Sequence, residues 1–82
     1  MEYEQILKNK IIDNEDTIEA LKMQILFKRQ RMNEIKMRLY QFQQLEAQIN
    51  KSLKRIEELK IFNRAYEISL KIYMDNKEQN NG

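Results

Sequence analysis

Cysteine, histidine and proline are absent from this chain of 82 residues, and its single glycine is the last residue, Gly82. The absence of cysteine and histidine excludes disulfides, thiolate nucleophiles and the usual zinc ligands. The absence of proline and internal glycine leaves residues 1–81 without the two strongest breakers of regular structure. We therefore expect long helices, in a chain so short that it needs association with another chain to hide enough apolar surface.

Long apolar runs are absent too. No uninterrupted apolar segment exceeds three residues, whereas a membrane-spanning helix needs about 20. The N-terminal segment 1–4 lacks the layout of a signal peptide. We expect a soluble, cytoplasmic protein without a membrane partner.

Apolar residues recur at alternating spacings of three and four from Leu7 to Ile56, interrupted by Asn14, Lys28 and Glu46. This period is typical of left-handed, coiled-coil-like packing of helices. We expect Asn14 to lie where the interface is open to water. For Lys28 and Glu46, exposure to water and a role in setting register or partner number remain alternatives. The candidates for the oligomer core are Ile18, Leu21, Ile25, Met32, Ile35, Leu39, Phe42, Ile49, Leu53, Ile56, Tyr66 and Leu70.

A second apolar pattern appears where the first one shifts. Beyond Ile56 the first pattern continues only after a displacement of three residues, and a separate line of apolar residues runs beside it at spacings of four, three and four. The two lines lie more than about 100° apart around a helix. The helix over residues 56–74 therefore needs two apolar neighbours, which indicates oligomerisation or a protein partner. This second line consists of Ile61, Ala65, Ile68 and Ile72.

Two polar clusters, 13–17 and 50–52, are the candidate turns, because they contain residues that cap and end helices. Turns there predict helices over about 3–12, 17–49 and 52–75, in a single helical domain 1–76 with a disordered tail 77–82. The expected fold is all-α: a long antiparallel helical hairpin, with or without the short N-terminal helix, assembled as an oligomeric coiled-coil-like bundle. A single continuous coiled-coil helix is the alternative.

Basic residues are concentrated in the middle of the chain. Residues 1–20 carry six acids and two bases, whereas residues 21–64 carry eleven bases and four acids. The bases of the stretch 28–38 flank the expected core, and the C-terminal helix has few acids to match them. We expect a partner with an acidic surface. The candidate partner-binding residues are Arg29, Arg31, Lys36, Arg38, Tyr40, Ile61, Ile68 and Ile72.

Catalytic motifs are missing. The serines and the threonine have no histidine to activate them, and there is no glycine-rich phosphate loop. The acids between residues 13 and 19 lack the spacing and the glycine of a calcium loop, so helix capping is the better interpretation. We expect a protein that is not an enzyme and has no catalytic residue, cofactor or metal.

The sequence favours a protein–protein interaction module: a homo-oligomer, most simply a dimer of hairpins, that regulates or inhibits another protein by occluding it. A nucleic-acid-binding helical dimer using the stretch 28–38 is an alternative. It is less favoured, because the bases lie within the heptads and the N-terminal segment is acidic. A structural coiled-coil scaffold is a further alternative.

Overall fold

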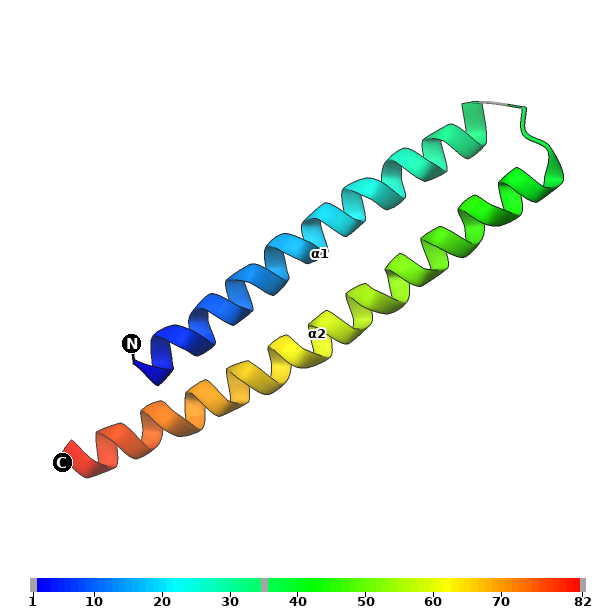
Figure 1. Cartoon of the computed structure of the whole chain (residues 1–82). Helices are drawn as coiled ribbons and strands as arrows, with labels where there is room; N and C mark the ends of the chain where they lie inside the picture. Colours follow the sequence, from blue (N-terminus) through cyan, green and yellow to red (C-terminus); the bar gives the residue numbers. More distant parts are fainter. Residues whose placement is uncertain (1, 35, 82) are drawn as a thin grey trace.

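Two long antiparallel helices make up the protein. A computed structural model describes residues 2–34 and 36–81, and within them it contains helix α1 (Tyr3–Glu34), helix α2 (Leu39–Asn81) and no strand. The helices lie side by side, with both ends of the chain at the end opposite the turn (Figure 1). The molecule measures 66 × 17 × 15 Å, with a radius of gyration of 18.9 Å, against about 12 Å for a compact chain of this length. The expected all-α helical hairpin is confirmed.

The turn between the helices lies at residues 36–38. The carbonyl oxygen of Arg38 accepts hydrogen bonds from the backbone N–H groups of Gln41 (3.0 Å) and Phe42 (3.1 Å). The side-chain oxygen of Gln41 in turn accepts a hydrogen bond from the Arg38 N–H, at 3.4 Å. This reciprocal arrangement resembles a capping box, in which the third helical residue reaches back to the capping residue. It starts α2 without glycine or proline.

The turns expected at 13–17 and 50–52 are not formed, because both segments lie inside helices. Thr17 donates its hydroxyl hydrogen to the carbonyl oxygen of Asp13 within α1, at 3.0 Å, instead of capping a new helix. No residue other than glycine has a positive φ in the described part of the chain, so Asn50 does not end a helix there. The helix bounds expected at 3–12, 17–49 and 52–75 therefore differ from those of the structure.

The C-terminal end differs from expectation as well. A disordered tail is expected over 77–82, but α2 continues to Asn81. Residue 82 lies outside the described residues. The short separate N-terminal helix is likewise replaced by a continuous α1.

Each helix presents one unbroken heptad pattern to the other. Every residue of these two sets is buried or half-buried, and the spacings alternate between three and four throughout. In α1 the set is Glu4, Leu7, Ile11, Asn14, Ile18, Leu21, Ile25, Lys28 and Met32. In α2 it is Leu45, Ile49, Ser52, Ile56, Leu59, Asn63, Tyr66, Leu70 and Tyr73.

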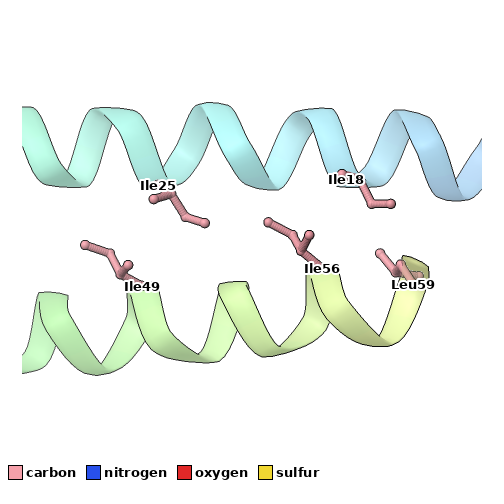
Figure 2. Close-up of a cluster of buried hydrophobic side chains, with 5 residues drawn as sticks. All are labelled: Ile18, Ile25, Ile49, Ile56 and Leu59. Carbon is pink, nitrogen blue, oxygen red and sulfur yellow. The ribbon is translucent and has the colours of Figure 1, made fainter. Parts of the chain in front are cut away.

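The centre of the hairpin is a cluster of buried aliphatic side chains. They point toward one another from the two helices (Figure 2), and partly buried Leu21 and Met32 pack against them. Each fully buried side chain of this type contributes about 1.5–3 kcal/mol by leaving water. This cluster therefore provides the main attraction between the helices. Its members are Ile18, Ile25, Ile49, Ile56 and Leu59.

Three of the predicted oligomer-core residues of α2 do not pack against α1 in the hairpin. Leu39 is 72% exposed, and Phe42 and Leu53 are exposed as well. The physical reason is the turn at 36–38, which resets the phase of the heptad. Counting in threes and fours from the core positions of α1 therefore does not reach the core positions of α2. Glu46 is exposed for the same reason. The predicted core residue Ile35 lies outside the described residues.

An asparagine pair interrupts the apolar interface. The side-chain amide of Asn14 donates a hydrogen bond to the side-chain oxygen of Asn63, at 2.9 Å. The amide of Asn63 donates to the carbonyl oxygen of Ile11, at 3.2 Å. Asn14 is therefore not simply open to water, as expected from the sequence, but bonds across the interface. Because the pair forms only when these two residues face each other, it favours one alignment of the helices.

Aromatic residues join the helices near the open end, where the two termini lie. The rings of Tyr3 and Tyr73 meet edge to face, with centroids 5.2 Å apart. The ammonium group of Lys10 lies 5.5 Å from the centre of the Tyr66 ring, within the range of a cation–π attraction. These contacts extend the interface beyond the aliphatic cluster.

Replacing Ile56 by alanine tests the position of the core. Ile56 is 4% exposed, so Ile56→Ala should lower the free energy of unfolding by about 2–5 kcal/mol through lost burial and a cavity. The matched control Leu39→Ala removes an exposed side chain and should change it by less than about 0.5 kcal/mol. Urea unfolding followed by circular dichroism, at equal protein concentrations, measures both. Equal losses in the two variants would contradict the observed register.

Replacing both asparagines tests the polar pair. The double variant Asn14→Leu/Asn63→Leu should melt at a higher temperature than the natural chain, because an apolar pair at core positions gains burial and leaves no amide unbonded. Each single variant should be less stable than the double variant, since it leaves one amide without its partner. A double variant that melts below the natural chain would show that the pair is needed for stability itself.

Candidate interaction surface

Five bases surround the turn, and we call Lys28, Arg29, Arg31, Lys36 and Arg38 the turn bases. Arg29 and Arg31 are exposed near the end of α1, while Lys36 and Arg38 are exposed in the connection. Lys28 is half-buried at a core position. The hairpin thus places these bases together at the end that holds the turn, which we call the closed end. The helix expected over 17–49 would have spread them along its length.

The turn bases are not neutralised by ion pairs. In the described part of the chain all ion pairs lie within one helix, at spacings of three or four residues, and none includes a turn base. Exposed pairs of this kind hold charges locally but contribute little to stability. The positive charge at the closed end therefore remains available to a partner. The pairs are Glu4–Lys8, Glu19–Lys22, Arg55–Glu58 and Glu57–Lys60.

Charge is separated along the hairpin. The half that contains the turn, residues 21–56, carries nine bases and two acids. The open half, residues 1–20 and 57–82, carries six bases and eleven acids. The two halves have net charges of +7 and −5, although the whole chain has only +2. An elongated molecule with this distribution attracts an anionic partner at one end only.

Aromatic side chains are exposed beside the turn bases. Tyr40, a predicted partner-binding residue, is 56% exposed in the first turn of α2. Phe27 and Phe42 are exposed as well, and neither is among the predicted binding residues. Phe42 is assigned to the core when the heptad is continued through the turn, so its exposure follows from the reset of the phase.

A shallow groove runs between the helices in the turn half. It has a volume of about 410 Å³. The buried residues Ile25 and Ile56 line it together with the more exposed Leu26 and Leu53. The charged residues along it are Lys22, Arg29, Glu57 and Lys60, of which Lys22 pairs with Glu19 and Lys60 with Glu57. An apolar groove that has Arg29 at its edge suits an acidic segment that also carries apolar side chains.

The second apolar line of the sequence is exposed on α2. We call Ile61, Ala65, Ile68 and Ile72 the outer stripe. Ile61 is 66% exposed, Ile68 54% and Ile72 56%, and Ala65 is exposed too. Because Ile61 and Ile68 each follow a core position by two residues, they point about 200° away from the interface with α1. The single hairpin leaves this stripe uncovered.

The predicted binding residues therefore form two separate surfaces. Arg29, Arg31, Lys36, Arg38 and Tyr40 lie near the turn, at the end of α1, in the connection and at the start of α2. The three isoleucines of the outer stripe lie in the open half. Along α2, Tyr40 and Ile61 are about 30 Å apart at 1.5 Å per residue. One small ligand cannot contact both surfaces.

Groups suited to chemistry are few in the described part of the chain. It contains no group of three or more acidic, cysteine or histidine residues that could hold a metal ion. The pKa of Glu4 lies below its usual value, because Lys8 donates a hydrogen bond to its carboxylate and attracts its charge. No described helix is long and apolar enough to cross a membrane.

Comparisons of the chain with models of protein families, with curated proteins and with solved structures find no match. The features of the molecule that indicate a function are the two surfaces and the groove, through their charge and exposure.

Replacing Lys28 by isoleucine tests the one turn base at a core position. Lys28→Ile should raise the melting temperature by about 4–8 °C, the shift expected for roughly 1 kcal/mol in a domain of this size. The control Gln30→Ile changes an exposed position of the same helix and should have a smaller effect. Differential scanning calorimetry and mass measurement in solution check the result. A changed number of subunits would show that Lys28 specifies the assembly instead.

Proposed function

We propose that this chain is a cytoplasmic, non-enzymatic protein–protein interaction module that works as a homo-oligomer. It binds another protein through an acidic surface of that protein and acts as a small regulator or inhibitor. The observation that carries this proposal is the net charge of +7 over residues 21–56, where the turn bases take part in none of the ion pairs of the described residues. The apolar groove lies beside them at the same level of the hairpin.

Charge and groove have different roles in such binding. The exposed turn bases attract an acidic surface over a distance and orient it, which mainly speeds association. The apolar side chains of the groove, Leu26 and Leu53 among them, supply the desolvated centre that exposed charges alone do not provide. Together they favour a partner segment with acids flanking one or two apolar residues.

The mechanism that fits this surface is occlusion. The molecule is 66 Å long, and a rod of this length acts on a partner by covering its surface. Binding to an acidic segment would exclude any other basic protein that uses the same segment.

Nucleic acid is the second candidate partner. The exposed rings of Tyr40, Phe42 and Phe27 beside the turn bases favour it, because bases of a single strand stack on aromatic side chains next to cationic groups. Against it stands the open half, whose net charge of −5 repels a long phosphate backbone. A protein partner avoids this repulsion, because its acidic surface is limited in extent.

Reversing two turn bases tests the proposal. In Arg31→Glu/Arg38→Glu both changes are at exposed positions, so helicity should be retained while capture of acidic proteins from the native cell extract should fall at least tenfold. The matched control, Lys71→Glu/Lys77→Glu, makes the same charge change on exposed residues of the open half and should retain capture. Quantitative mass spectrometry of the retained proteins measures both.

Salt separates the two candidate partners. Binding of a labelled single-stranded DNA probe would weaken steeply between low and moderate salt, since each neutralised phosphate releases a counterion. Capture of a protein held partly by the apolar groove should weaken much less. Unchanged capture by Arg31→Glu/Arg38→Glu would show that the turn bases are only solvated surface.

A further inference from the structure

The outer stripe is uncovered although its spacing is that of a helix interface. Its residues follow one another at intervals of four, three and four, the pattern that packs one helix on another. Its three isoleucines are more than half exposed, on the side of α2 that faces away from α1. The corresponding outer face of α1 is interrupted by Asp13 and Asp16, so the stripe is the better candidate for a second interface.

The surface area of the chain leaves room for such an interface. The accessible surface is 6772 Å² for a chain of 10.1 kDa, whereas a compact protein of this mass exposes about 5300 Å². The excess is larger than the roughly 800 Å² per partner that a typical specific interface covers. One interface along α2 could therefore bring the chain to the usual exposure.

The spacing of the outer stripe reads the same in both directions. In an antiparallel pair of α2 helices related by a two-fold axis, Ile61 can face the partner's Ile72, and Ala65 can face the partner's Ile68. All four positions then meet apolar residues at once. Such a self-complementary patch is what a closed dimer requires.

Two other pairings are less favourable. A parallel pair would also match the stripe with itself, but it would bring two turn halves of net charge +7 side by side. An antiparallel pair that overlaps the basic half of one chain with the acidic half of the other would set Ile61 against the partner's Lys51 and Ile68 against the partner's Gln44. Exposed charges are screened by salt, so the burial of apolar surface decides between the antiparallel alternatives.

We propose that a second copy of this chain covers the outer stripe, in a two-fold antiparallel dimer of hairpins centred between Ala65 and Ile68. This inference rests on the proposed homo-oligomer and names its interface. The two sets of turn bases then lie at opposite ends of the dimer, which binds two acidic partners at once. The interface is held by apolar contacts. Beside it Arg64 faces the partner's Lys71, so added salt does not weaken the dimer.

Mass in solution tests the interface. The natural chain should have twice the mass of one chain in light scattering at micromolar concentrations. Ile61→Glu/Ile68→Glu should be a helical monomer, and the control Phe27→Glu, which changes an exposed apolar residue elsewhere, should stay a dimer. A monomeric natural chain, or a dimer that survives the double change, overturns the proposal.

Distances between spin labels test the orientation without altering the stripe. The chain has no cysteine, so Gln48→Cys and Asn76→Cys each carry one nitroxide per chain, at positions that are exposed in the hairpin. At 1.5 Å per residue, the proposed dimer places labels about 55 Å apart at position 48 and about 30 Å apart at position 76. These two distances, measured by pulsed electron resonance, support the proposal.

The alternatives give different pairs of distances. The antiparallel pair that sets Ile61 against the partner's Lys51 is centred at residue 56. It places the labels about 25 Å apart at position 48 and about 60 Å apart at position 76. A parallel pair gives less than about 20 Å at both positions, because packed helices lie 8–10 Å apart. Either pattern overturns the proposed dimer. The proposed function fails by a separate result, unchanged capture of acidic proteins by Arg31→Glu/Arg38→Glu. The monomeric variant should still capture them, at one site per molecule.

Discussion

The structure depends on the antiparallel packing of two heptad runs of equal length, residues 4–32 and 45–73. Each run is about 42 Å long at 1.5 Å per residue. When the two runs pair side by side over their whole length, only a short connection is left for the turn. The aliphatic cluster around Ile25 and Ile56 provides the attraction, and the pair Asn14–Asn63 favours this alignment over a shift by one heptad. Everything on the outer faces takes its position from this register.

The apolar period of the sequence coincides with the interface of the hairpin in α1 but not throughout α2. Ile18 and Ile25 are buried between the helices, whereas Leu39 and Leu53 are exposed. The turn gives no glycine or proline signal, since Arg38 and Gln41 form its cap. Ile49 and Ile56 are core positions both in the heptad continued from α1 and in the true heptad of α2. The change of phase is therefore not visible at these two residues. Asn63 and Ser52 occupy core positions of the true phase, and as polar residues they weaken its apolar signal.

The two candidate surfaces differ in how far the sequence could predict them. The outer stripe depends only on the period of one helix, so Ile61, Ile68 and Ile72 are found by spacing alone and are exposed in the hairpin. The grouping of the turn bases depends on where the chain reverses. A turn at 50–52 would leave Arg29 and Lys36 in the middle of a helix, whereas the turn at 36–38 places them together at one end. Exposure of Phe42 beside them follows from the same reversal.

Charge separation links the proposed dimer to the proposed function. In the two-fold pairing the helical residues next to the turns, Leu39 in each chain, lie about 80 Å apart along the common axis, at 1.5 Å per residue. A partner with a single acidic patch cannot contact both ends of so long a rod. The dimer would therefore bridge two partner molecules, or two distant sites of one large assembly, and in the second case both contacts together would hold far more tightly than either alone. The outer stripe lies toward the open end of α2, and this position is what keeps the two binding ends apart.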